Sequence, residues 1–378
     1  MIIFKLYYTI MKIGILTYPL NNNYGCYMQS YALMKFLKDS GCDVEYIHRR
    51  HDKPSYRFYV KFAILRTLKN ILKFEWKSPI YNYEWEYMLK KGMNLISFFE
   101  NNIVPHTRPI YTKNKLSKLC KKYDVIIVGS DQVWRAEILS NIDDYFLSFL
   151  GDRNVKRISY AASFGKSNPG YSLSQISKCG KAIKKFTAVS VRENVGKDII
   201  SRYGWQCPPP KVVLDPTMLL DKSDYLSLID EKDEEETVLG YILDQTDEKK
   251  KILSQVANIL DINECNFLKD VKLNNYLYPT IQKWLGMLFK SKFVVTDSFH
   301  GAVFSVIFNR PFVVLLNKDR GAARFETLLK ITGLEDRILH PNNSLEDIVQ
   351  KPINWELVND KIMRERNSSI DFLNKALI

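Results

Sequence analysis

The chain has 378 residues, of which 46% are hydrophobic and 26% charged, and its formal net charge at pH 7 is +13. This composition excludes an intrinsically disordered chain, and at about 150 residues per domain we expect two domains. The positive charge favours anionic partners such as phosphorylated substrates, anionic membrane surfaces or nucleic acid, although a solvated basic face explains it equally well.

The cysteines and the apolar start of the chain limit the class further. Six cysteines are scattered without any C-x-x-C pair, which is typical of reduced thiols in the cytoplasm rather than of a disulfide framework or a zinc site. Residues 1–10 are apolar, but no small-residue cleavage site follows them, and no stretch reaches the about 20 apolar residues of a membrane span. We expect a soluble cytoplasmic protein whose translation starts at Met1 or at Met11.

Short β-rich runs alternate with helical patterns along the first 215 residues. Between the first two runs, apolar residues recur at helical spacing from Tyr27 to Leu37, and Gly41 stands where such a helix ends. The runs are rich in Val and Ile and apolar on both faces, as buried parallel strands are. The pattern predicts a parallel sheet with helices on both faces. Its expected strands are residues 12–17, 43–48, 124–129, 156–161, 188–192 and 211–214.

A basic segment interrupts this alternation at about residues 49–120. Residues 49–91 carry eleven Lys or Arg against four Asp or Glu, and apolar residues from Phe58 to Leu72 lie along one helical face. A helix of this kind either lies on an anionic membrane surface or packs its apolar stripe on the domain, which is the more frequent arrangement. Both interpretations stay open from the sequence.

A second alternating series begins after Asp215. Its expected strands are residues 237–243, 265–268, 293–296 and 312–316, and a helical pattern runs from Trp355 to Leu377. The acidic segment 230–236 has the composition of a solvated boundary. We therefore expect one α/β domain over residues 1–215 with a helical insertion at about 49–120, a second over 216–350, and a final helix over 351–378 that packs back across both.

Polar residues follow three of the expected strands, and open parallel sheets bind ligands at the carboxyl ends of their strands. The first of these clusters, Asn23, Tyr24 and Gly25, comes just before a helix. Its amide groups have two equally good explanations: they converge on an anion or a sugar, or they form an Asn-rich turn that caps the helix.

The second cluster follows the apolar run at residues 124–128 and contains Ser130, Asp131 and Trp134. Ser and Asp side chains bind ligand hydroxyls, but they also cap helices, which explains half of this signal. The indole of Trp134 offers a face on which a sugar ring stacks.

The third cluster, Asp297, Ser298 and His300, lies where an expected strand ends and an apolar helix begins. Helix N-termini favour negative charge, and a histidine there donates to a phosphate or carboxylate, or exchanges protons near neutral pH. A structural histidine fits these residues equally well. His300 is nevertheless the best placed of the five histidines.

Arginine and lysine residues complete the candidates. Arg192 ends an expected strand, where a guanidinium holds a carboxylate or phosphate through two parallel hydrogen bonds. Lys318, Arg320 and Arg324 follow another strand, although each also fits a surface charge. The usual motifs of ATP hydrolysis, zinc proteolysis, esterase chemistry and NAD binding are missing from the sequence.

Seven segments of the sequence, taken in order, resemble the polysaccharide pyruvyl transferase family. They run from about residue 12 to residue 334 and read NYGCYMQSYAL, VGSDQVW, ISYAASFG, SVRE, VLDPTMLL, TDSFHGAVFSVIFNRPFVVL and RFETLLKITGL. Each segment alone is a weak signal, but their shared order and spacing make the resemblance strong.

The resemblance implies an α/β fold of two Rossmann-like domains that face each other across a cleft, as in GT-B glycosyltransferases. It implies an enzyme that moves a pyruvyl group from phosphoenolpyruvate to two hydroxyls of a sugar in a cell-surface polysaccharide, which forms a cyclic ketal. The acceptor would lie on the N-terminal domain and the donor on the C-terminal one. Such chemistry requires no metal and no cofactor.

The resemblance also suggests roles for the candidate residues. Arg192, Lys318 and Arg324 would bind phosphoenolpyruvate, His300 would protonate the enol carbon or neutralise the departing phosphate, and Asp131 would orient or deprotonate the sugar hydroxyl. Further expected substrate-binding residues are Asn23, Tyr24, Gly25, Ser130, Trp134 and Ser298.

One departure from the family pattern bears on the donor. In the better-understood pyruvyl transferases an arginine lies two residues before the histidine, and here that position is Ser298. Arg320 or Arg324 would have to substitute for it.

Two other functions therefore stay open: a GT-B-like glycosyltransferase that uses a nucleotide sugar, and a catalytically silent glycan-binding partner. Nucleic acid is not an expected partner, because no recognised binding motif accompanies the charge. The expected partners are phosphoenolpyruvate and a glycan acceptor, lipid-linked or free, with peripheral contact to the inner membrane surface as a further option.

Overall fold

The computed structural model describes residues 11–50, 92–229, 236–271, 278–316 and 321–378, together with the positions Ile64 and Thr67. Several expectations from the sequence fall outside the described residues. They concern the apolar start at 1–10, most of the basic segment 49–91, the acidic segment 230–235, Lys318 and Arg320.

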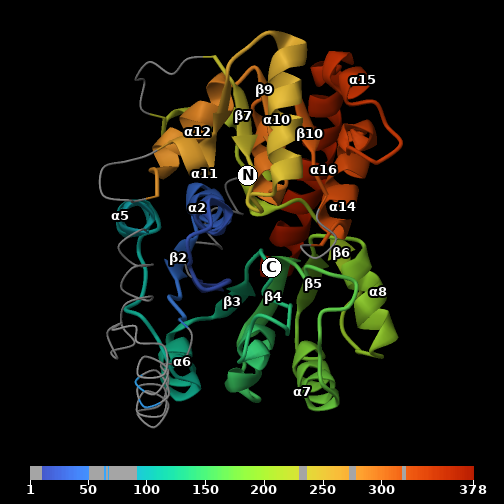
Figure 1. Ribbon diagram of the computed structural model, residues 1–378. Coiled ribbons are helices and arrows are strands. Elements are labelled where there is room, and N and C mark those ends of the chain that lie inside the picture. Colours follow the sequence, from blue (N-terminus) through green and yellow to red (C-terminus); the bar gives the residue numbers. More distant parts are fainter. Residues whose placement is uncertain are drawn as a thin grey trace.

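The described chain forms two parallel sheets, the first in the lower half of Figure 1 and the second in the upper half. The first has six strands in the order β2-β1-β3-β4-β5-β6, and the second has four in the order β10-β9-β7-β8. Each expected strand is present, most of them shorter by one or two residues at an end. The strands are β1 (Lys12–Leu16), β2 (Asp43–Tyr46), β3 (Val125–Val128), β4 (Lys156–Ala162), β5 (Ala188–Val191), β6 (Lys211–Val212), β7 (Val238–Tyr241), β8 (Glu264–Asn266), β9 (Phe293–Thr296) and β10 (Phe312–Val314).

Helices cover both faces of each sheet, because successive side chains of a strand point to opposite faces. In β3, Ile127 packs in the core that also contains α2, whereas Ile126 and Val128 pack in a second core with α7. The helices are α2 (Tyr24–Asp39), α5 (Met93–Asn102), α6 (Lys113–Leu119), α7 (Leu173–Ile183), α8 (Val195–Arg202), α9 (Lys222–Leu226), α10 (Asp247–Leu260), α11 (Phe267–Asp270), α12 (Ile281–Lys290), α13 (Phe299–Ile307), α14 (Ala323–Thr332), α15 (Leu345–Gln350) and α16 (Trp355–Leu377).

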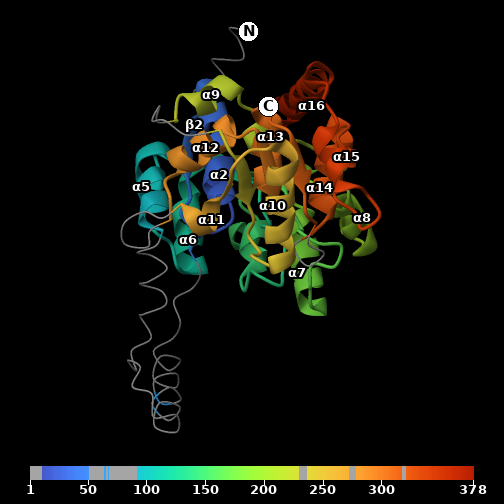
Figure 2. The same ribbon diagram turned by 45° about the horizontal axis from the view of Figure 1, so that its top comes forward.

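The two sheets share one hydrophobic core. This core joins α2 and strands of the first sheet to α12, α13 and strands of the second, while α10 and α15 pack on the opposite face of the second sheet (Figure 2). Tyr24 of α2 stacks on Trp284 of α12 with ring centroids 5.3 Å apart, and its hydroxyl donates to the carbonyl of Pro279 at 2.7 Å. The core therefore fixes the first helix against the second sheet.

Strand order decides where the carboxyl ends of the sheets leave an opening. In the first sheet the order reverses between β1 and β3, and in the second between β7 and β9. At such a point the segments that follow the two neighbouring strands leave toward opposite sides of the sheet. Parallel sheets bind ligands in the crevice that opens between these segments. The loops after β1, β3 and β9, together with the first turns of α2 and α13, contain the three polar clusters found in the sequence.

No helix within the described ranges combines the length and apolarity that a membrane crossing requires.

Candidate functional site

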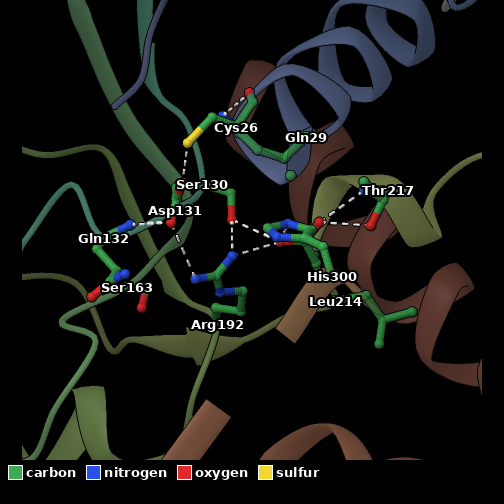
Figure 3. Close-up of polar contacts among 12 residues, drawn as sticks. Cys26, Gln29, Ser130, Asp131, Gln132, Ser163, Arg192, Leu214, Thr217 and His300 are labelled. Atoms are coloured by element: carbon green, nitrogen blue, oxygen red, sulfur yellow. Dashed lines mark hydrogen bonds and ion pairs between the residues drawn. The ribbon is translucent and has the colours of Figure 1, made fainter. Parts of the chain in front are cut away.

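Side chains from both sheets converge on a buried polar cluster (Figure 3). Asp131 follows β3, Arg192 follows β5, Asp215 follows β6, and His300 lies in the first turn of α13. Each of these side chains belongs to a residue that is at most 4% exposed. Because buried charges persist only when they are paired, the contacts within the cluster decide what it can do.

Asp215 holds the centre of the cluster together. Its Oδ2 accepts hydrogen bonds from Arg192 Nη1 at 2.8 Å and from Ser130 Oγ at 3.1 Å. Its Oδ1 accepts from both the backbone and the hydroxyl of Thr217, at 3.1 and 2.7 Å. The carboxylate of Asp215 therefore holds the Arg192 guanidinium through Nη1.

The two remaining nitrogens of the Arg192 guanidinium lie near carboxylates but form no hydrogen bonds with them. Nη2 lies 3.7 Å from Asp131 Oδ1, and Nε lies 4.0 Å from Glu193 Oε2. Neither nitrogen has a hydrogen-bond partner among the described residues. Nε and Nη2 form the edge of a guanidinium that binds carboxylates and phosphates in a bidentate manner.

His300 is held between α2 and Asp215. Its Nε2 lies 3.7 Å from Asp215 Oδ2 and has no hydrogen-bond partner in the described part of the chain. On its other side, a Cβ atom placed on Gly25 would lie only 1.9 Å from Nδ1. The imidazole thus rests directly on the backbone of the first turn of α2, which only glycine permits.

Asp131 is fixed by contacts to its neighbours. Its backbone adopts the left-handed conformation with φ of 72°, which an Asp tolerates better than most residues. Its Oδ1 accepts from the backbone of Gln132 at 2.8 Å, and its Oδ2 accepts from the thiol of Cys26 at 2.8 Å. Both oxygens are therefore engaged.

A second guanidinium lies beside the first. Arg192 Cζ lies 4.5 Å and Arg324 Cζ 5.6 Å from the ring centroid of Phe299, so both cations contact one aromatic ring. Burial, reinforced by the charge of Arg192, lowers the pKa of Arg324 to about 10. Arg324 is still protonated at neutral pH, and the cluster carries two cations.

The carboxylates of the cluster are ionised because of these cations. Burial alone would raise the pKa of Asp215, but the nearby His300 and Arg192 outweigh it and hold that pKa below its usual range. Burial acts against ionisation of Asp131 too, yet Arg192 and His300 lower its pKa. Burial and then Asp131 raise the pKa of Cys26, so its thiol stays protonated and donates. The arrangement is a network of fixed, paired charges.

Within the described ranges, no group of three or more His, Cys, Asp or Glu side chains is placed to hold a metal ion. The structure brings together five residues expected from the sequence, with Gly25 directly against one of them. These five are Ser130, Asp131, Arg192, His300 and Arg324.

Two expectations from the sequence are wrong. Trp134 is fully buried, stacks on Phe146 at 4.9 Å and donates its indole N–H to the carbonyl of Tyr145, so it has no face for a sugar. Tyr24 is 1% exposed and belongs to the core between α2 and α12. Trp134 and Tyr24 are therefore structural residues.

Two other expected binding residues act as helix caps. The side chain of Asn23 accepts from the backbone of Gly25 at 3.0 Å at the start of α2. The hydroxyl of Ser298 accepts from the backbone of Gly301 at 3.3 Å at the start of α13, and Ser298 is 3% exposed. Asp297 accepts from two backbone amides of the loop after β7 and from Lys249 Nζ at 2.6 Å. Capping and loop anchoring account for all three.

The sequence reasoning missed Asp215, Phe299, Cys26 and Glu193 as members of the cluster. Asp215 could have been predicted from the sequence, because it is an acidic residue that follows an expected strand directly and precedes a proline. Glu193 follows Arg192, and its Oε1 accepts from Ser163 and from two backbone amides of the loop after β4. Phe299 and Cys26 look like core residues in the sequence, and only their neighbours show otherwise.

Two parallel sheets whose carboxyl ends meet around this cluster define a GT-B-like α/β fold. A model of the polysaccharide pyruvyl transferase family matches residues 23–319, which is most of the chain. The chain belongs to this family of transferases. No curated protein matches the sequence.

Solved structures resemble the chain in fold. The UDP-GlcNAc 2-epimerase from Methanocaldococcus jannaschii aligns with a TM-score of 0.51 and 12% identity, over 90% of this chain and 91% of its own. A proposed UDP-N-acetylglucosamine 2-epimerase from Listeria monocytogenes aligns with a TM-score of 0.51 and 7% identity, over 94% and 90%. A spinosyn forosaminyltransferase aligns with a TM-score of 0.44 and 10% identity, over 96% and 95%. At these identities the likeness to the two epimerases concerns the fold alone.

Proposed function

We propose that the protein transfers a pyruvyl group from phosphoenolpyruvate to two hydroxyls of a sugar in a cell-surface polysaccharide, which yields a cyclic ketal and inorganic phosphate. The family supports this reaction class. The observation that carries the proposal is the buried pair Arg192 and Arg324 beside His300, since a small multiply charged anion requires cations where water is excluded. The donor is a cytosolic metabolite, so the reaction belongs to the cytoplasm.

Phosphoenolpyruvate carries a carboxylate and a phosphate, and the cluster offers donors for both. The Nε and Nη2 atoms of Arg192 have no hydrogen-bond partner among the described residues, so this edge is available for a bidentate contact. Arg324 supplies the second cation in place of the arginine that the family pattern expects at position 298. The first turn of α13 adds the positive end of its helix dipole.

His300 is the proposed proton carrier. In the first step the imidazolium gives its proton to the methylene carbon of the enol, and a sugar hydroxyl adds to the central carbon. The neutral imidazole then accepts the proton of that hydroxyl. In the second step another hydroxyl of the sugar displaces phosphate, and its proton leaves with the phosphate. A positioned acid or base of this kind accelerates a reaction by roughly 10²–10⁴-fold.

Asp131 takes a different role in this proposal from the base that the sequence suggested. Both of its oxygens accept hydrogen bonds, and its pKa is lowered, so it is a poor acceptor for the proton of a hydroxyl. Its carboxylate instead faces Arg192 Nη2 at 3.7 Å. We assign Asp131 as a positioning residue that keeps the Arg192 guanidinium in place.

The test is incubation of the protein with phosphoenolpyruvate and a panel of p-nitrophenyl or lipid-linked sugars. Phosphate release and the mass gain of one pyruvyl ketal on the sugar are the readouts. We expect His300→Ala and Arg192→Ala to abolish turnover, whereas the exposed His340→Ala and Arg108→Ala remain active. Near-normal rates in His300→Ala would refute the role of the imidazole, and nucleotide-sugar consumption without use of phosphoenolpyruvate would refute the donor.

A further inference from the structure

A pocket of about 840 Å³ opens next to the buried cluster. It lies between the loop after β4, the start of α8 and the start of α14, so both sheets contribute to its wall. Pockets of this size accommodate sugars and other small ligands. Its polar lining includes Ser167, Asn168, Asn194, Asp198, Glu326 and Thr327.

Gly321 connects this pocket to the second guanidinium. Gly321 lines the pocket, and a Cβ atom placed on it would lie 3.5 Å from Arg324 Nε. The same Cβ would lie 1.6 Å from the carbonyl oxygen of Gly165, which shows how closely the loops from the two sheets meet here. A ligand in the pocket is therefore next to the proposed donor site.

The charge of the pocket differs from that of the cluster. Its lining contains the carboxylates Glu137, Asp198 and Glu326 against the amines Lys166 and Lys330. Glu137 pairs with Arg135 at 2.7 Å and with Lys166 at 3.2 Å, so its charge is compensated. In the part of the chain that the structure describes, neither Asp198 nor Glu326 forms an ion pair.

The carboxylates of Asp198 and Glu326, which are both exposed in the lining, oppose the binding of an anion in this pocket although the whole chain is basic. Amides, hydroxyls and free carboxylates are instead the groups that hold the hydroxyls of a sugar.

We propose that this pocket binds the acceptor sugar and that Asp198 and Glu326 make it select uncharged sugars over uronic acids and phosphorylated sugars. The inference rests on the proposed function and extends it to the class of acceptor. It separates the two substrates by charge: the anionic donor binds at the guanidinium cluster and the uncharged acceptor binds in the neighbouring pocket.

The first experiment compares p-nitrophenyl hexosides with the matching hexuronides as acceptors. We expect the double variant Asp198→Asn, Glu326→Gln to raise kcat/KM for hexuronides by about three- to tenfold, mainly through KM, because repulsion by two partly solvated carboxylates is removed. Hexoside kinetics should change much less. The matched control Glu356→Gln, Asp360→Asn alters exposed carboxylates of α16 and should leave both acceptors unaffected. An unchanged preference in the first double variant would overturn the inference.

A second variant separates this inference from the proposed function. Ala322 lines the pocket, so Ala322→Trp should fill it and weaken hexoside binding at least tenfold in calorimetric titrations without phosphoenolpyruvate, whereas Ala322→Ser should not. If hexosides bind and Ala322→Trp blocks them but no ketal ever forms, the pocket stands and the proposed function fails. If ketals form equally well in Ala322→Trp, or if no uncharged hexoside binds, the pocket inference fails.

Discussion

At the scale of single residues, Gly25 determines where His300 lies. Its Cα approaches the imidazole so closely that an added methyl group would lie 1.9 Å from Nδ1 and 2.3 Å from Cγ. A contact under 3 Å forces one of the two groups to move, and the imidazole is the more easily displaced. The glycine is therefore part of the proposed proton-transfer machinery although it has no side chain.

We expect Gly25→Ala to lower turnover of phosphoenolpyruvate by at least about 100-fold, because a misplaced proton carrier loses most of its effect. Overpacking should cost only about 1–3 kcal/mol of unfolding free energy. The control is Gly204→Ala, where φ is 63° and an added Cβ meets nothing within 4 Å. That variant should lose stability through backbone strain and keep full activity. Equal activity in the two variants would contradict the role of Gly25.

The buried carboxylate of Asp215 leads to a second prediction, which concerns how the stability of the protein depends on pH. Its pKa is lowered in the folded protein, so it contributes stability above the pKa of an unfolded Asp, about 3.9, and this contribution is lost as pH falls further. Asp215→Asn should reduce the unfolding free energy at pH 7 by about 3–5 kcal/mol, because Arg192 loses its main partner. Below pH 4 the variant should lose less additional stability than the wild type.

Urea unfolding between pH 3 and pH 7, followed by tryptophan fluorescence, measures both effects. The exposed Asp371→Asn serves as the control and should follow the wild type at every pH. An Asp215→Asn protein with the same acid sensitivity as the wild type would show that Asp215 is not the carboxylate concerned.

The candidate site could be predicted in part from residue types at strand ends. Ser130, Asp131, Arg192 and His300 each follow a strand, so the common edge of the parallel sheets brings them together. Trp134 also follows a strand, but its side chain turns into the core. Residue type and spacing do not determine which way a loop side chain points, so burial at these positions could not be predicted.

At the scale of elements, the start of α13 contains the departure from the family pattern, which is Ser298 in place of an arginine. Ser298 caps this helix through its hydroxyl. Its backbone N–H donates to the hydroxyl of Thr296 at 3.0 Å, and that hydroxyl donates in turn to the carbonyl of Tyr241. Ser298 is 3% exposed, so an arginine at this position would lose the hydroxyl cap and would have to place its guanidinium among buried neighbours.

We therefore expect Ser298→Ala to lower the unfolding free energy by about 1 kcal/mol, the usual cost of a lost N-cap. Ser298→Arg, which restores the residue of the family pattern, should cost several times more, since it removes the cap and buries a cation next to Arg192 and Arg324. Thermal unfolding of both variants measures this order. A Ser298→Arg protein as stable as the wild type, with improved phosphoenolpyruvate use, would show that the site can hold a third guanidinium.

The strands themselves were predictable because each is buried on both faces and reads as an apolar run. Their ends were less so: the expected strand at residues 211–214 pairs over Lys211–Val212. The backbone of Val213 still donates to the carbonyl of Val191 at 3.0 Å, whereas that of Leu214 donates to Ser369 Oγ of α16 at 3.0 Å. Contacts with distant segments, which no local pattern contains, decide where pairing stops.

At the scale of the whole molecule, α16 ties the end of the chain to the first sheet. Arg366 Nε donates to the carbonyl of Met218 at 2.7 Å, Lys211 Nζ donates to the carbonyl of Ser368 at 2.8 Å, and Lys156 Nζ donates to the carbonyl of Ile378 at 2.6 Å. The sequence indicated a long closing helix, but the partners of its polar residues lie about 150 to 220 positions away and could not be inferred. The same helix packs in the core that both sheets share.

This shared core leads to the last prediction, that the two sheets unfold together. Leu373 of α16 is fully buried in the core that contains Ile13 of the first sheet and Val294 of the second. Leu373→Ala should cost about 2–5 kcal/mol and shift one calorimetric transition to lower temperature, with the van't Hoff enthalpy still close to the calorimetric one. Leu357→Ala, at a position of the same helix that is 49% exposed, should change stability by no more than about 0.5 kcal/mol. Two separate transitions, of which Leu373→Ala shifts only one, would mean that the core divides at the boundary between the sheets and that the cluster around Arg192 forms without the cooperation of α16.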